Sequence, residues 1–211
     1  MIIAIDGPAA AGKGTLARRL AAHLDLAFLD TGRLYRAVGL AVRQGGGDPE
    51  KPADAVAAAR ALDPEHLDTA DLYTETVAEA ASKVAAIPEV RAVLLAFQRD
   101  FAGRPPGGKR GAVLDGRDIG SVVCPDADFK FFITAAAEKR AERRYKELQE
   151  AGLASTKAAV LAEIKERDER DSTRNVSPLK AVDACVIDTS DMTPDAVFEM
   201  ALAHIESAKQ S

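Results

Sequence analysis

The chain has 211 residues, 47% hydrophobic and 29% charged, proportions that suit a soluble protein with one buried core. Its 28 lysines and arginines stand against 33 aspartates and glutamates, and a net charge of -5 argues against a nucleic-acid coat or a membrane-surface protein. Two cysteines and three scattered histidines exclude a disulfide framework and a cysteine-based zinc site, and the apolar runs fall short of the roughly 18 residues that span a bilayer.

Five strand-like apolar segments alternate with longer helical stretches, which predicts a parallel sheet covered by helices. The segments are residues 2–5, 27–29, 112–114, 129–133 and 185–187. Between the first two, residues 13–23 repeat leucine every four residues, the pattern of a helix with one face on a core. The alanine-rich residues 52–62 are predicted to form a small helical insertion. Residues 101–111 contain four glycines and two prolines and are predicted to be a loop.

The strongest motif directly follows the first strand and reads Gly7-Pro8-Ala9-Ala10-Ala11-Gly12-Lys13-Gly14-Thr15. Its glycines let the backbone curl so that consecutive N–H groups point at a phosphate, while the next helix's N-terminus and Lys13 add positive charge. Strand, spacing, lysine and helix together favour a phosphate-binding loop over a ligand-free turn. Gly14 stands where such loops usually place the hydroxyl that touches magnesium. We therefore expect no direct protein ligand to the metal, with Thr15 and Asp115 reaching it through water.

A phosphate loop does not by itself name a reaction, since switches, motors and kinases share it. A guanine switch needs an Asn-Lys-x-Asp base reader, but the chain's single asparagine, Asn175, is followed by Val176. Motor and strand-transfer ATPases usually bring larger cores or basic nucleic-acid faces, which this acidic chain does not suggest. A small-molecule kinase fits the sequence best.

Three further clusters carry candidate binding groups. Residues 29–36 bring a hydroxyl, an aromatic ring and arginines to the start of a helix, and residues 114–120 put two carboxylates and an arginine at a strand's carboxyl end, where parallel sheets bind ligands. On a third segment, Arg167, Arg170, Asp171 and Arg174 share one helical face. Each cluster alone would suit a helix cap, an Asp-Gly turn or a solvated helix. Beside a phosphate loop, the binding interpretation is favoured.

These segments together resemble the bacterial cytidylate kinases of the nucleoside-monophosphate kinase family. The likeness is carried by IAIDGPAAAGKGT, LDTGRLYRAV, AASKVAAIPEVR, LDGRDIGSVVCPDA, AEKRAERRYKELQ and IKERDERDSTR, and extends to residues 188–190. It implies a three-layer α/β/α P-loop kinase fold with a five-stranded parallel sheet in one domain. The core is expected at about 1–44, 104–150 and 178–211, the acceptor-binding region at about 45–103 and a helical lid at about 151–177. Residues 63–76 are too few for the family's small strand insertion, so we expect a shortened one.

The resemblance also implies substrates and residue roles. ATP would bind the loop from Gly7 to Thr15 together with Mg²⁺, and CMP or dCMP would be the acceptor. The implied cytosine contacts are Ser82, Arg91 and Asp118, the acceptor-phosphate contacts are Thr31, Arg36 and Arg117, and the sugar contacts are Tyr35, Asp171 and Arg174. The implied catalytic residues are Lys13, Arg117, Arg167 and Arg170.

Two alternatives stay open at this point. One is a P-loop kinase for another small acceptor, such as UMP, AMP or a hydroxylated metabolite, and the other is a regulator that binds nucleotide without turning it over. The negative charge, the short apolar runs and a strand that starts at Ile2 predict a cytoplasmic protein without a signal peptide and without nucleic-acid or membrane partners. We expect it to be a monomer.

Overall fold

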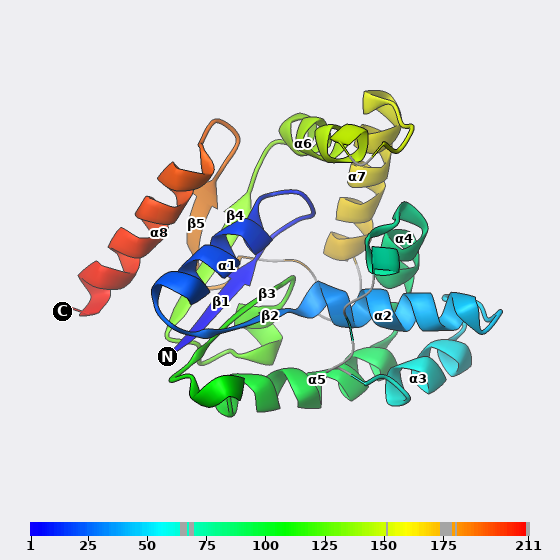
Figure 1. Ribbon diagram of the computed structural model, residues 1–211, viewed down its shortest axis with the longest axis horizontal. Helices are drawn as coiled ribbons and strands as arrows, with labels where there is room; N and C mark the ends of the chain where they lie inside the picture. Colours follow the sequence, from blue (N-terminus) through cyan, green and yellow to red (C-terminus); the bar gives the residue numbers. More distant parts are fainter. Residues whose placement is uncertain (64–66, 68–69, 151, 174–178, 180, 210–211) are drawn as a thin grey trace.

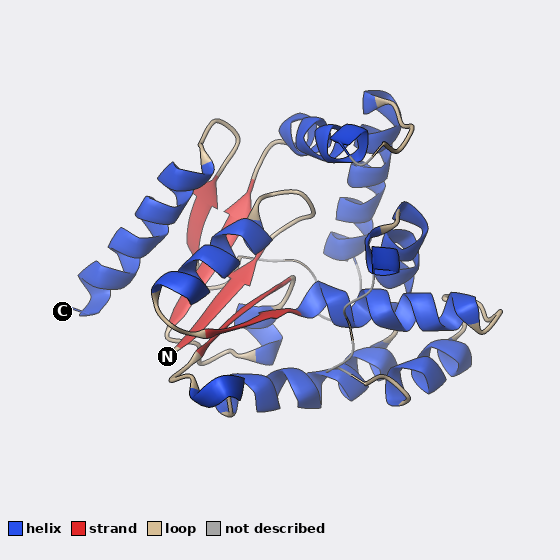
Figure 2. Cartoon of the chain, viewed as in Figure 1, coloured by secondary structure: helices blue, strands red, loops and turns tan. Residues whose placement is uncertain are grey.

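The computed structural model describes residues 1–63, 67, 70–150, 152–173, 179 and 181–209. Five parallel strands form one sheet, as predicted (Figure 2), and their order is β2-β3-β1-β4-β5. The strands are β1 (Ile2–Asp6), β2 (Ala27–Asp30), β3 (Ala112–Gly116), β4 (Phe129–Thr134) and β5 (Cys185–Asp188). Because they run parallel, their carboxyl ends meet at one edge, where Asp6 pairs with Gly116 and Asp30 with Asp115.

Helices cover both faces of this sheet and make the three layers (Figure 1). The helices α1 (Lys13–His23) and α8 (Pro194–Lys209) pack on one face, and α5 (Pro88–Gly103) and the π-turn η3 (Ile119–Val123) pack on the other. Strand β1 alternates accordingly. Ile3 and Ile5 belong to the α1–α8 core and Ala4 to the α5–η3 core, as the two-residue period of a strand requires.

A helical region extends from the sheet and has its own apolar core. It consists of α2 (Thr31–Gln44), α3 (Pro52–Arg60), the 3₁₀ turn η1 (Ala70–Tyr73), α4 (Glu75–Val84) and the first half of α5. Prolines start α3 and α5, where the missing N–H costs nothing, and the Thr74 hydroxyl caps α4 by accepting from the Val77 N–H. Within the described part of residues 45–103 no strand occurs, in line with the shortened insertion expected from the sequence.

The loop predicted from residue 101 starts later than expected. Phe101, Ala102 and Gly103 form the last turn of α5, because Ala102 is buried and Phe101 packs beside it against the sheet. The helix ends before Arg104, which precedes Pro105 and is therefore pushed out of helical geometry. A short 3₁₀ turn, η2 (Pro106–Gly108), then leads to β3.

Two helices, α6 (Ala137–Glu150) and α7 (Lys157–Thr173), lie beyond the carboxyl edge of the sheet (Figure 1). They pack on each other through a small apolar cluster, which consists of Ala141, Leu148, Val160 and Ile164. Across the described residues, no helix combines the length and the apolar character needed to cross a membrane.

Candidate functional site

The phosphate loop connects β1 to α1 in a tightly curled path. Gly7 has a φ of 144°, and a Cβ added there would lie 1.9 Å from the carbonyl oxygen of Ile133, so only glycine fits. Gly12, with a φ of 93°, directly precedes the helix. Six of the nine predicted loop residues line a cavity of about 720 Å³: Ala9, Ala10, Gly12, Lys13, Gly14 and Thr15. Gly7, Pro8 and Ala11 are buried behind them and shape the turn.

Lys13 is the buried cation of this loop, and its Nζ donates to the carbonyl oxygen of Pro8 at 2.8 Å. Burial and, after it, the nearby charge of Arg117 lower the pKa of Lys13 to about 7. A bound anion would stabilise the ammonium form that burial disfavours. The local electrostatics therefore favour binding of a phosphate at Lys13.

Two carboxylates stand at the ends of neighbouring strands beside the loop. Burial and, after it, the charge of Asp30 raise the pKa of Asp115 to about 7. Asp30 in turn lies 3.6 Å from the Arg36 guanidinium. The Asp115 Oδ2 lies 3.3 Å from where a Cβ on Gly14 would be, so this carboxylate faces the last glycine of the loop.

The first two turns of α2 carry the predicted acceptor-side residues Thr31, Tyr35 and Arg36, which all line the same cavity. The hydroxyl of Thr31 donates to the backbone oxygen of Asp115 at 2.7 Å, which ties α2 to the end of β3. The hydroxyl oxygen of Thr31 can therefore still accept a hydrogen bond, but its proton is already donated to Asp115. The guanidinium of Arg91 lies over the Tyr35 ring, 5.4 Å from its centre.

Arg91 and Asp118 form a buried ion pair deep in the cavity. Arg91 reaches it from α5 and also donates to the Ala85 carbonyl at 3.1 Å, while Asp118 directly follows Arg117 after β3. Ser82 on α4 lines the same cavity and accepts a hydrogen bond of 3.3 Å from Arg170. One charged donor, one carboxylate and one hydroxyl thus line this cavity, a set of groups that can read the edge of a base.

Helix α7 closes the cavity from the other side. Asp171 is buried and accepts from the Nε of Arg117 at 2.8 Å, so the helix is tied to the end of β3. The Nε of Arg167 is buried and has no hydrogen-bond partner among the described residues. Burial, followed by the charge of Arg117, lowers the pKa of Arg167 to about 10. Arg174, predicted on the same face, lies outside the described residues.

The cavity therefore gathers the predicted residues that the structure describes, apart from the three buried loop residues. It also contains residues to which the sequence analysis assigned no role, among them Arg18, Glu75 and Arg144. Arg18 lies one helical turn after Gly14, so this spacing could have predicted that Arg18 faces the same cavity. Arg144 on α6 pairs with Glu75 on α4, a contact across 69 residues of chain for which no local signal exists.

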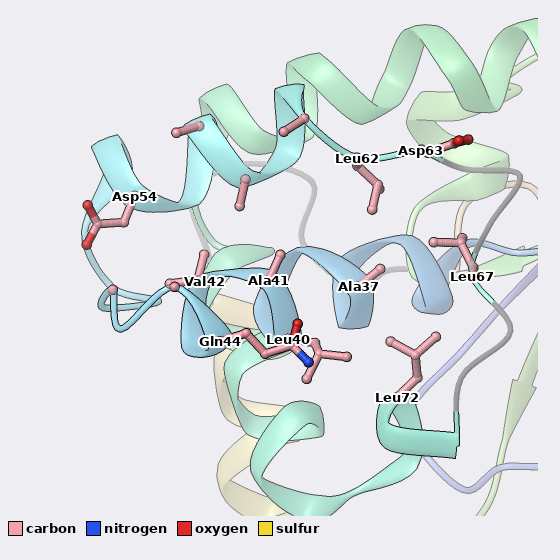
Figure 3. A pocket seen from close by; sticks show the side chains of 15 residues that line it. Ala37, Leu40, Ala41, Val42, Gln44, Asp54, Leu62, Asp63, Leu67 and Leu72 are labelled. Carbon is pink, nitrogen blue, oxygen red and sulfur yellow. The ribbon is translucent and has the colours of Figure 1, made fainter.

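A second cavity, of about 610 Å³, lies between α2 and α3 and has a different character (Figure 3). Its lining is mostly alanine, leucine and valine, and its two charged residues, Asp54 and Asp63, are both acidic. An anionic nucleotide would gain no charge pairing there. The phosphate chemistry therefore belongs to the first cavity.

Comparison with known proteins shows the family of the chain. The family model described as cytidylate kinase matches residues 3–207. A cytidylate kinase of Paramagnetospirillum magneticum is 61% identical over 209 residues, which cover 99% of each chain. That of Rhodospirillum rubrum is 60% identical over 203 residues, covering 96% of this chain and 95% of the relative.

Among solved structures, an uncharacterized protein from Eubacterium ventriosum superposes with a TM-score of 0.58 at 16% identity. The match covers 98% of this chain and 99% of that one, and at this identity it is a likeness of fold alone. The family is carried by the full-length relatives and by the family model. On both counts, the chain belongs to the cytidylate kinase family.

Proposed function

We propose that this chain transfers the γ-phosphoryl group of ATP to CMP or dCMP, giving ADP and CDP or dCDP. The observation that carries the proposal is the convergence on one cavity of basic groups from the phosphate loop, α2, the end of β3 and α7: Lys13, Arg36, Arg117, Arg167 and Arg170. Among the described residues the buried Nε of Arg167 has no hydrogen-bond partner, so it adds a donor for an anion. These donors can pair with the phosphates of two substrates side by side. Membership of the cytidylate kinase family supports the same reaction.

In the proposed reaction, an oxygen of the CMP phosphate attacks the γ-phosphorus of ATP in line. The bond from that phosphorus to the bridging β-oxygen breaks, and ADP leaves with the electron pair. No general base is needed, because a phosphate monoester has a second pKa of about 6 and is mostly ionised at neutral pH. Lys13, Arg117 and Arg167 align the phosphates and balance their charge, and α7 keeps water away from ATP.

Asp118 and Arg91 give the proposal its base selectivity. The exocyclic amino group of cytosine can donate to the Asp118 carboxylate, while N3 or O2 accepts from Arg91. Uracil would place an oxygen against that carboxylate, so two acceptors would face each other in a buried site. Such a mismatch costs more than a missing contact.

The residues beside the loop fit a magnesium ion held mainly by ATP. Mg²⁺ prefers oxygen ligands and keeps several waters, and Asp115 and Thr15 offer a carboxylate and a hydroxyl at the cavity wall. Both would hold the hydrated ion through water, with Asp115 placed by its position against Gly14. The bound ion would offset the negative charge of the donor phosphates.

A coupled assay of ADP formation over CMP, dCMP, UMP and AMP tests the proposal. We expect turnover with CMP and dCMP and far weaker turnover with UMP and AMP. Equal rates with UMP would contradict the base-reading role of Asp118. Binding of ATP with no ADP formed on adding CMP would favour a regulator instead.

The proposal includes a cytoplasmic enzyme that acts as a monomer on small nucleotides. The chain's net charge of -5 supports free nucleotides over nucleic acid as its partners. The basic residues around the cavity are a small part of the 28 in the chain, so an acidic molecule can still offer local partners for phosphates.

A further inference from the structure

The turn η3 directly follows Arg117 and Asp118 and sets where both residues lie. It is a five-residue π-turn in which the Asp118 carbonyl accepts from the N–H groups of Val122 and Val123, at 2.9 and 3.1 Å. The first N–H groups of such a turn have no partner within it. Whatever satisfies them also fixes the backbone next to Asp118.

Asp6, the last residue of β1, provides that partner. Its Oδ1 accepts from the Ile119 N–H at 2.7 Å, and its Oδ2 accepts from the Gly120 N–H at 2.8 Å. The side chain is 6% exposed, so the carboxylate is spent on these two bonds rather than on solvent. Asp6 itself is held by the sheet, where it pairs with Gly116 on one side and Phe132 on the other.

The other end of η3 is attached to α5. Arg99 donates to the carbonyls of Val123 and Val122, at 3.1 and 2.9 Å, and eight residues earlier the same helix supplies Arg91, the partner of Asp118. The segment from Asp118 to Val123 is thus clamped between β1 and α5. A group placed on rigid elements in this way can discriminate between ligands that differ by one atom.

We propose that Asp6 is a positioning residue for base selection, which sets the place of the Asp118 carboxylate through its two hydrogen bonds to η3. The inference rests on the proposed role of Asp118 and adds a residue that does not touch the substrate. Asp6 also directly precedes Gly7, where the phosphate loop begins. One carboxylate therefore fixes the backbone of the acceptor site relative to that of the ATP site.

Burying the Asp6 carboxylate costs free energy, which argues that its two acceptor oxygens are needed for the two N–H groups of η3. Burial raises the pKa of Asp6 to about 6, against the lowering effect of the two backbone hydrogen bonds. An asparagine would be cheaper to bury but could accept only one of the two N–H groups and would set its own NH₂ against the other. The start of η3 would then have to move, and Asp118 with it.

The experiment compares kcat/KM for CMP with that for UMP in purified Asp6→Asn. We expect the CMP-over-UMP preference to fall about tenfold, the size of effect expected when a hydrogen-bonded charged group is misplaced. The KM for ATP should stay within about threefold, because the loop keeps its own anchors. A role in stability alone would lower the melting temperature and leave the preference unchanged.

Asp128→Asn is the matched control, because its carboxylate accepts from the Ile2 N–H at 2.6 Å, at the opposite end of the same strand. It should keep the wild-type preference. If Asp6→Asn does not fold, Arg99→Met tests the turn from its exposed end. We expect this variant to lower the CMP-over-UMP preference about fivefold. The inference is overturned if the CMP-over-UMP preference falls by less than about threefold in folded Asp6→Asn. If Asp6→Asn does not fold, the same limit applies to Arg99→Met.

Asp118→Ala, measured in parallel, separates this inference from the proposed function. It should abolish the preference for CMP. If Asp118→Ala loses the preference while Asp6→Asn keeps it, only the positioning role of Asp6 is wrong. If Asp118→Ala keeps the wild-type preference, the base-reading role itself fails and the inference falls with it.

Discussion

Lys13 lies where burial disfavours the charged form of its amine. Its Nζ has the Pro8 carbonyl as a partner, but burial and Arg117 lower its pKa to about 7, so at pH 8 the neutral amine predominates in the free protein. ATP phosphates beside Nζ would favour the ammonium again and raise the pKa. Binding of ATP is therefore linked to the uptake of a proton.

We expect ATP binding at pH 8 to take up close to one proton, and less as the pH falls below about 7. Calorimetric titrations in two buffers of different ionisation enthalpy measure this uptake. Lys13→Met should abolish the uptake and lower kcat about a hundredfold or more, because a charge that stabilises the transferring phosphoryl group is lost. Lys51→Met, which removes an exposed lysine away from the cavity, is the control. Unchanged uptake in Lys13→Met would show that another group titrates.

The α6–α7 pair is an element with a small core and polar attachments. Its apolar cluster is far smaller than the core under α1 and α8. Polar contacts connect it to the rest: Arg140 on α6 donates to the carbonyl of Ala9 at 3.3 Å, and Asp171 on α7 accepts from Arg117 at 2.8 Å. We expect such an element to open at a lower free energy than the sheet core, as the predicted lid, which includes α7, requires.

Leu148→Ala should loosen this pair without unfolding the core. Leu148 is 3% exposed within the small cluster and does not line the cavity, so its loss removes packing and no substrate contact. We expect faster hydrogen exchange in α6 and α7, a small change in melting temperature and a lower kcat. Leu20→Ala in the α1 core is the control and should lower the unfolding free energy by about 2–5 kcal/mol. Equal loss of protection throughout the chain in Leu148→Ala would mean that the pair is no separate unit.

How far the sequence predicts these elements depends on whether the signal is local. The five strands are short apolar runs, and the phosphate loop has fixed spacing, so both could be located directly. The last turn of α5 was missed because Phe101 and Ala102 are helical through packing on the sheet, despite the glycines and prolines that follow. The hydrogen bonds from η3 to Asp6 could not be predicted from the sequence, because Asp6 and Ile119 meet only once β1 lies beside β3.

For the site, parallel topology is what makes motifs predictive. Once the strands are parallel, loops after β1, β2 and β3 must meet at one edge, and Lys13, Thr31 and Arg117 line one cavity as a result. Contacts between helices follow no such rule. Arg144 and Glu75 join α6 to α4 through the packing of whole elements, which the spacing of residues in either helix does not reveal.

At the scale of the whole molecule, Asp6, Asp115 and Lys13 are buried ionisable groups at this edge of the sheet whose shifted pKa values make the stability depend on pH. Asp6 and Asp115 have pKa values raised from 3.8 to about 6 and about 7, mainly by burial. The folded state therefore binds more protons than the unfolded state between about pH 4 and 7, and stability falls as the pH rises through that window. Lys13 acts in the opposite direction above pH 7, because its pKa is lowered from 10.5.

The unfolding free energy of Asp115→Asn should accordingly increase relative to that of the wild type as the pH rises from 5 to 7. An amide cannot ionise, so the variant escapes the cost of burying a carboxylate, and the difference should grow by on the order of 2 kcal/mol. Urea unfolding at each pH, followed by circular dichroism, measures it. Val42→Ala removes only buried apolar volume in α2 and should shift the curve equally at every pH. If the difference in unfolding free energy between Asp115→Asn and the wild type is also constant with pH, the Asp115 carboxylate does not titrate in this range. Its ionisation would then not destabilise the folded protein near neutral pH.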